Sequence, residues 1–136
     1  MSDFKLHTMK AIDFLIEVDP DLDRVYKQVG LPKFWTRPNN FSGMLMFILE
    51  QQVSLTSAKA VFEKLKQIVS EITAKNFVQI KDTKLRGIGF SKQKIKYCRN
   101  LAEEVLIGHL NFEQLNLLSD KEVKKRLILN ILGIEL

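Results

Sequence analysis

The chain has 136 residues, of which 46% are hydrophobic and 27% charged, a size and composition that fit one modest globular core. Its single cysteine excludes an intramolecular disulfide and any metal site built on several thiolates, and no apolar run is long enough to span a bilayer. Lys and Arg outnumber Asp and Glu by 21 to 16, which makes a polyanionic partner worth considering. We therefore predict a single cytoplasmic domain over residues 1–136, with no metal and no cofactor.

The first part of the chain predicts three helices and a loop. Apolar residues recur at helical spacing, without the alternation of a half-buried strand, so we expect an all-α protein. A first helix is expected over about residues 7–16. Asp19 as N-cap, Pro20 in the first turn and Gly30 as stop delimit the second. Two prolines and an Asn pair make residues 31–40 a loop. The third helix is expected to bury Phe41, Leu45, Ile48 and Leu49.

The second part of the chain contains five polar residues placed to cap helices, at Ser54, Thr73, Ser91, Asn111 and Ser119. Ser119 forms a capping box with Glu122, and the last helix is expected to end near Ile131. A turn is expected over residues 86–89, with Gly87 and Gly89 able to adopt positive φ. The Ser54 helix is expected to pack through Ala58, Val61, Phe62, Leu65 and Ile68, and the Ser91 helix through Ile95, Cys98, Leu101, Ala102, Val105 and Leu106.

Three segments in order carry a family resemblance: "FSGMLMFILEQQVSLTSAKAVFEKL", "LRGIGFSKQKIKYCRNLAEEV" and "LSDKEVKKRLILNILGI". The chain resembles the helix-hairpin-helix DNA glycosylases, in the branch of 3-methyladenine DNA glycosylase II. The resemblance implies a multi-helix orthogonal bundle whose C-terminal part is missing from this chain. It also implies an enzyme that flips an alkylated purine out of double-stranded DNA and hydrolyses its N-glycosidic bond.

The resemblance assigns Gln52 to the break between two helices, where the family inserts a side chain into the gap left by the flipped base. A glutamine amide can both donate to and accept from the orphaned opposite base. Gln51, Ser54 and the helix start that Ser54 caps could hold nearby backbone or phosphate. The alternative is that "QQVS" is only a polar kink between two core helices.

Two further groups of residues are candidates for DNA contacts. Lys92, Lys96 and Arg99 share one helical face and could meet the DNA backbone, although such a stripe could also be a solvated surface. Gly133 and Ile134 match the start of the family's phosphate-binding hairpin. Glu135 replaces its second glycine, which disfavours positive φ and places an anion where a phosphate should approach.

No residue of this chain is assigned the catalytic role. The resemblance places the family's catalytic Asp beyond Leu136, so we expect no base release by this chain alone. Phe34 and Trp35 could line a pocket that stacks an alkylated base, or could close the edge of the core. His7 and His109 lack the partners of a nucleophile's base and are expected at the surface.

Two functional hypotheses follow from these observations. The first is a truncated 3-methyladenine glycosylase-type polypeptide that retains the base-flipping elements. The second is a nonenzymatic helical module that binds DNA, a protein partner, a missing C-terminal half or a second copy. Its contact surface would be a terminal apolar face made of Ile128, Ile131, Leu132, Ile134 and Leu136.

Overall fold

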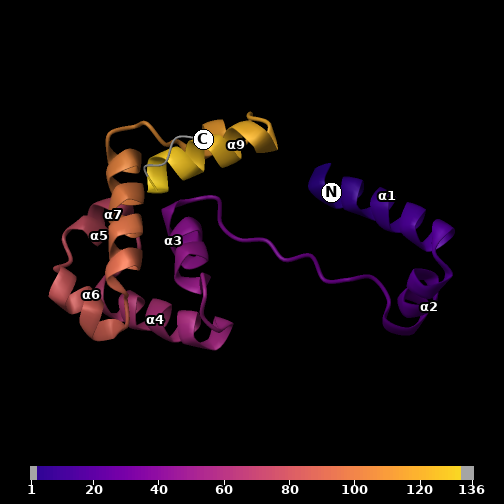
Figure 1. Ribbon diagram of the computed structural model, residues 1–136, viewed down its shortest axis with the longest axis horizontal. Coiled ribbons are helices and arrows are strands. Elements are labelled where there is room, and N and C mark those ends of the chain that lie inside the picture. Colours follow the sequence, from indigo (N-terminus) through magenta and orange to yellow (C-terminus); the bar gives the residue numbers. More distant parts are fainter. Residues whose placement is uncertain (1–2, 133–136) are drawn as a thin grey trace. The chain divides into compact units, whose positions relative to one another are not determined.

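A computed structural model describes residues 3–132, and every regular element in that range is helical (Figure 1), which confirms the prediction of an all-α protein. The chain divides into two compact units, Met1–Thr36 and Arg37–Leu136. The prediction that residues 1–136 form one domain stays a prediction. None of the helices described in residues 3–132 is both long and apolar enough to cross a bilayer.

The first unit is a pair of helices, α1 (Asp3–Val18) and α2 (Pro20–Val29). The predicted cap of α2 is confirmed, because Asp19 Oδ1 accepts hydrogen bonds from the N–H groups of residues 21 and 22, and Gly30 ends the helix at φ 76°. The predicted bounds of the first helix were too short, since no helix breaker lies between residues 3 and 18. Neither helix contains a buried residue, so this pair does not build a core of its own.

The second unit is a helical bundle with α7 at its centre (Figure 1). Helices α3, α5 and α6 and the C-terminal turn η1 all pack against α7, and α4 packs against α3 and α6. The elements are α3 (Phe41–Glu50), α4 (Leu55–Ile68), α5 (Ala74–Val78), α6 (Asp82–Ile88), α7 (Lys92–Leu106), α8 (Phe112–Leu115), α9 (Asp120–Leu127) and the π-helix η1 (Ile128–Leu132).

One core holds this unit together, and four helices each contribute a fully buried leucine: Leu45, Leu65, Leu85 and Leu101. The predicted buried face of α3 is confirmed. On α4, Ala58 and Leu65 are buried and the other three predicted residues are partly buried. The predicted face of α7 is confirmed for its first four residues, which are buried, and for Val105, which is partly buried against the core. Leu106 is 50% exposed because α7 ends there, beyond the core.

The five predicted caps are confirmed. Each of Ser54, Thr73, Ser91, Asn111 and Ser119 accepts a hydrogen bond from a backbone N–H in the first turn of the following helix. The capping box of α9 is also complete. Hydrogen bonds from the hydroxyl and backbone N–H of Ser119 lower the pKa of Glu122, because they stabilise its carboxylate.

Helix α6 is an element that the sequence analysis missed. Residues 86–89 were expected to form a turn in which Gly87 and Gly89 could adopt positive φ, but Gly87 lies within α6 and, of the two, only Gly89, at φ 113°, is left-handed. The helix forms because Leu85 is completely buried, which offsets the poor helix propensity of Gly87. Asp82 lies in the first turn of α6, where the positive end of the helix dipole favours an acidic side chain.

The last described elements differ from the expected terminal helix. The α-helix α9 ends at Leu127 and continues as η1, and Ile131 is only 8% exposed. The Ile131 carbonyl accepts a hydrogen bond from Asn100 Nδ2 of α7 at 3.1 Å. Ile131 therefore belongs to the core and not to an exposed terminal face, because η1 packs on α7. The predicted residues Ile134 and Leu136 lie outside the described part of the chain.

Candidate nucleic-acid interface

The break between α3 and α4 carries the strongest candidate residue, Gln52. Helix α3 ends at Glu50, Gln51 is extended, and Ser54 starts α4 by accepting a hydrogen bond from the Ser57 N–H at 3.1 Å. Between them, Gln52 has φ 59°, the one positive φ of a non-glycine residue in the described chain. A left-handed conformation costs a residue with a Cβ atom about 1–2 kcal/mol, so the surrounding backbone must hold Gln52 there.

The side chain of Gln52 is exposed, and no contact within residues 3–132 ties its amide to the protein. If this break were only a polar kink between core helices, the Gln52 amide would be expected to hydrogen-bond the ends of those helices, because helix ends need partners. Here those partners come from other residues. The structure therefore leaves the Gln52 amide available for an external ligand.

Gln51 has the opposite arrangement. Its Nε2 donates to the Phe47 carbonyl at 3.1 Å, and its backbone N–H donates to the Ile48 carbonyl at 3.3 Å. The DNA contact predicted for Gln51 stays a prediction, and within the protein its amide is engaged at the end of α3. The two adjacent glutamines thus differ, since one closes the helix and the other projects from it.

A cavity of about 680 Å³ lies beside this break, between α3, α7 and the α9–η1 segment. One wall is apolar, with Met44, Phe47 and Ile48 from α3 and Leu127, Ile128 and Ile131 from the last helix. The polar wall comes from the two helix breaks and α7, and includes Gln51, Gln52, Ser91, Gln93, Lys94 and Tyr97. Gln93 Nε2 donates to the Tyr97 hydroxyl at 2.5 Å, which orients both side chains along α7.

A second hollow, of about 630 Å³, lies away from the break, where the end of α4 meets α5 and α6. Its polar lining consists of exposed side chains such as Gln79, Lys81 and Lys84, and it holds no buried titratable group among the described residues. This hollow is therefore a weaker candidate site than the cavity beside Gln52.

The three cations predicted to share a DNA-binding face do not behave alike. Lys92 and Lys96 are exposed on α7. Arg99 instead binds Asp82 Oδ1 through Nε at 2.9 Å, donates to the Ile80 carbonyl at 2.5 Å, and lies 5.6 Å from the centre of the Phe77 ring. Arg99 thus joins α7 to the α5–α6 connection, and this engagement within the fold disfavours the DNA contact predicted for it.

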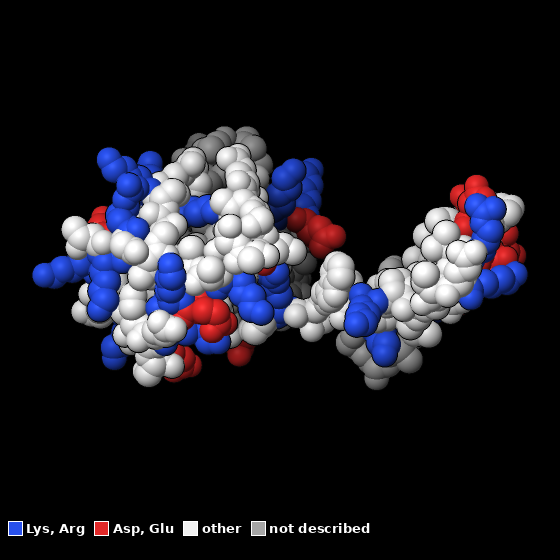
Figure 2. All heavy atoms as spheres, turned by 90° about the horizontal axis from the view of Figure 1, so that it is seen from below, with Lys and Arg blue, Asp and Glu red and all other residues white. Residues whose placement is uncertain are grey.

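One face of this unit carries charges of both signs. On the face shown in Figure 2, Lys and Arg side chains are scattered among acidic and uncharged ones and form no continuous block. Electrostatic attraction to a polyanion is therefore spread over many separate charges, and it will weaken as salt screens them. Specific recognition must come from a local feature such as the Gln52 break.

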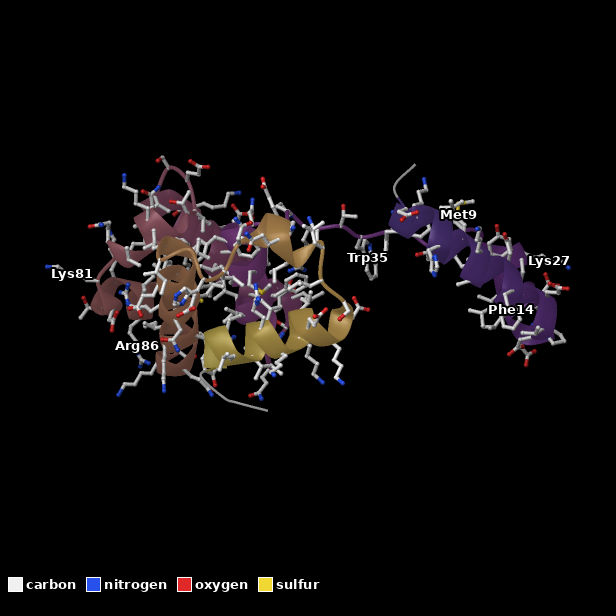
Figure 3. All side chains as sticks on the ribbon, turned by 90° about the horizontal axis from the view of Figure 1, so that it is seen from above. Met9, Phe14, Lys27, Trp35, Lys81 and Arg86 are labelled. Atoms are coloured by element: carbon white, nitrogen blue, oxygen red, sulfur yellow. The ribbon has the colours of Figure 1, made fainter. Side chains whose placement is uncertain are left out.

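The predicted pocket aromatics, Phe34 and Trp35, belong to the other unit. Trp35 is 89% exposed and projects from the segment after α2 (Figure 3), while Lys5 lies 5.8 Å from the centre of the Phe34 ring. Neither residue closes the edge of a core within its own unit. Gly133 and Ile134, predicted to bind phosphate, lie outside the described residues.

The remaining titratable residues do not form a catalytic or metal-binding cluster in the described part of the chain. No three His, Cys, Asp or Glu side chains of residues 3–132 come together as metal ligands. Burial raises the pKa of the Cys98 thiol to about 12, although nearby Lys94 and Arg99 lower it in part, so Cys98 is not a nucleophile at neutral pH. His7 is exposed, and His109 Nδ1 lies 3.3 Å from Glu104 at the surface, as expected.

The sequence analysis did not single out Lys94, Tyr97 or Arg37, although all three lie at or next to the break. One signal for Lys94 was present in the sequence. A lysine in the first turn of a capped helix lies at the positive end of the helix dipole and needs a compensating partner. The partner itself, a carbonyl of α3, could be found only in the structure.

The chain matches the HhH-GPD family, described as "HhH-GPD superfamily base excision DNA repair protein", over residues 45–132. Its structure is similar to that of a DNA-3-methyladenine glycosidase from Bacillus halodurans, with a TM-score of 0.69 and 29% sequence identity. The match covers 88% of this chain and 56% of that protein, so the chain spans little more than half of its structural relative. A search of curated proteins found no match. The family match covers α3 to η1, including the Gln52 break and α7, and the chain belongs to the HhH-GPD superfamily of base excision DNA repair proteins.

Proposed function

We propose that this chain opens duplex DNA at damaged bases, as the lesion-recognising part of a DNA glycosylase. The observation that carries the proposal is Gln52, an exposed glutamine held in a left-handed conformation at a helix break of an HhH-GPD protein. An enzyme that acts on a base must take it out of the stack, and the gap must be filled to keep the base out. The Gln52 amide enters the gap and hydrogen-bonds the opposite base through its donor and its acceptor.

The surroundings of Gln52 support contacts with the DNA backbone. Helix α4 starts three residues later and has 14 residues, so its N-terminus can attract a phosphate next to the opened base pair. Lys92 and Lys96 are exposed near the start of α7 and supply sequence-independent phosphate contacts. Arg99 has no part in the proposal, because its guanidinium is engaged within the fold.

The substrate class and the chemistry follow from the relatives. The structural relative is a DNA-3-methyladenine glycosidase, and we propose alkylated purines in double-stranded DNA as the bases that this chain exposes. Excision breaks the bond between the base and the sugar C1′ and joins C1′ to the oxygen of a water molecule. The reaction needs a carboxylate, and no described residue of this chain is assigned that role. The cytoplasmic location also remains a prediction.

A first experiment tests base release by this chain alone. No carboxylate of the described residues 3–132 is assigned to the reaction, so we expect no free alkylated purine after incubation with methylated duplex DNA. Chromatography of the released bases measures the outcome, with the DNA incubated without protein as control. Release at many turnovers per protein molecule would show that a carboxylate within the chain performs the reaction.

A second experiment tests the gap-filling role of Gln52. The change Gln52→Ala removes the amide, and we expect about tenfold weaker binding to a duplex with an abasic-site analogue, because one amide hydrogen-bonds the opposite base. The free energy of unfolding should change by less than about 0.5 kcal/mol, since the side chain is exposed. Fluorescence anisotropy with labelled duplexes measures the affinity, and urea denaturation measures the stability.

A matched control for this variant is Gln67→Ala, which removes an exposed glutamine from α4 at a distance from the break. Its affinity should stay within about twofold of the wild type. Equal affinity of Gln52→Ala and wild type for the abasic duplex would contradict the proposed function. A stability loss above about 1 kcal/mol would make Gln52 a structural residue.

A further inference from the structure

The end of α3, immediately before Gln52, is closed by donors from two places in the chain. Gln51 supplies two of them, to the Phe47 and Ile48 carbonyls. The next carbonyl, that of Leu49, accepts a hydrogen bond from Lys94 Nζ of α7 at 2.6 Å, across 45 residues of sequence. The carbonyls of Phe47, Ile48 and Leu49 therefore all have donors, and the third donor comes from another helix.

The charges around this contact are placed where a single helix would not favour them. The first turn of α7 contains Lys94 and no acidic residue, so the ammonium lies near the positive end of that helix. The last turn of α3 contains no basic residue and ends in Glu50, which is near the negative end. Lys94 thus gives α3 the cation that its own sequence lacks.

A second cation, Arg37, contacts the same last turn of α3. Arg37 pairs with Glu50 at 2.5 Å, and its guanidinium lies 4.5 Å from the centre of the Phe47 ring. The segment that carries Arg37 lies against α3 where only glycine fits, since a Cβ atom at Gly43 would be 2.0 Å from the Pro38 carbonyl oxygen. Glu50 is therefore neutralised without Lys94, which leaves Lys94 for the backbone carbonyl.

Lys94 is partly buried and borders the cavity beside Gln52. Its contact with Leu49 fixes the point from which the chain leaves α3, and Gln52 follows three residues later in its strained conformation. The strain persists only if the flanking backbone is held, and Ser54 holds the other side by capping α4. The break is therefore anchored by Lys94 before Gln52 and by Ser54 after it.

We propose that Lys94 is a positioning residue for Gln52, which acts through the Leu49 carbonyl and sets the break in the geometry that fills a DNA gap. This inference rests on the proposed function. Lys94 need not touch DNA, because its ammonium is engaged by the carbonyl. It contributes by preorganising the break, so that binding does not have to order it.

A double-mutant cycle between Lys94 and Gln52 tests the inference on the full chain. The affinities of the wild type, Lys94→Met, Gln52→Ala and the double variant are measured for a duplex with an abasic-site analogue and for the intact duplex. We expect Lys94→Met to weaken binding to the abasic duplex about fivefold, and the double variant to bind no more than about twofold more weakly than Gln52→Ala. Independent effects would instead multiply to about fiftyfold.

The matched control is Lys64→Met, which removes an exposed lysine of α4 that has no hydrogen bond or ion pair to α3 in the described structure. It should leave the ratio of abasic to intact affinity unchanged, whereas Lys94→Met should lower that ratio. The variant Lys94→Arg, which keeps a cation and donors, should retain most of the ratio. If Lys94→Met does not fold, Lys94→Ala replaces it in the cycle, because its side chain also lacks a donor for the Leu49 carbonyl.

The outcomes separate this inference from the proposed function. If Gln52→Ala binds the abasic duplex as well as the wild type does, the proposed function fails and the role of Lys94 fails with it. If Gln52→Ala weakens binding but the Lys94 variant has no effect, or an effect that multiplies with that of Gln52→Ala, the proposed function stands and the inference about Lys94 is wrong.

Discussion

Two helix breaks in the second unit have the same local design and different uses. At the α3–α4 break, Gln52 is left-handed and Ser54 caps the next helix, while at the α6–α7 break Gly89 is left-handed and Ser91 caps the next helix. The residue between them is exposed in the first break (Val53, 45%) and buried in the second (Phe90, 2%). The α6–α7 break is therefore part of the core, and the α3–α4 break is part of the surface.

The left-handed residue of each break reflects this difference. A Cβ atom at Gly89 would lie 2.8 Å from Val61 Cγ2, so both the backbone angle and the available space require glycine. At residue 52 a glutamine occupies the same kind of conformation, although glycine would adopt it without strain. Packing explains the residue at the α6–α7 break, whereas at the α3–α4 break packing does not explain it, which favours a role in binding.

The largest effect is expected from Gly89→Ala. The added methyl group meets Val61 and is held at φ 113°, so the free energy of unfolding should fall by about 3 kcal/mol. Urea denaturation measures this change. The variant Val61→Ala removes the clashing atom. In the Val61→Ala background, Gly89→Ala should therefore lower the free energy of unfolding by less than it does in the wild type. A fall of less than about 1 kcal/mol would show that the buried break adapts easily.

A smaller and opposite effect is expected from Gln52→Gly. Glycine relieves the left-handed strain but gains freedom in the unfolded chain, so the free energy of unfolding should rise by about 0.5–1 kcal/mol at most. Binding to the abasic duplex should weaken as much as for Gln52→Ala, because both lose the amide. Urea denaturation and fluorescence anisotropy measure the two quantities on the same protein. A loss of stability would show that the Gln52 side chain supports the fold, and the comparison of the two breaks would then no longer hold.

Much of the secondary structure followed from local sequence patterns. The serine, threonine and asparagine caps, the stop at Gly30 and the buried face of α3 were predicted correctly. Each depends on residues within a few positions of one another, and such contacts form wherever the local helix forms. Helix α6 was missed because glycine in its last turn reads locally as a turn, and only the burial of Leu85 against other helices decides otherwise.

The candidate site was predicted only in part. The resemblance pointed to Gln52, and the structure added that it is exposed and left-handed. A helical face identified by spacing placed Arg99 beside Lys92 and Lys96, yet Arg99 reaches Asp82, 17 residues away. Spacing along one helix cannot show which side chains meet another helix, so the role of each cation stayed open until its neighbours were known.

By itself, the sequence of this protein determined where most of its helices begin, because caps, helix stops and apolar periodicity act over one or two turns. Its segments also determined which family it resembles. The tertiary structure alone decided which polar side chains remain available. Arg99 and Lys94 find their partners 17 and 45 residues away, whereas the Gln52 amide has no partner among residues 3–132. The physical reason is that hydrogen bonds between helices depend on how the core packs them, and that packing cannot be read from the spacing of residues within any one helix.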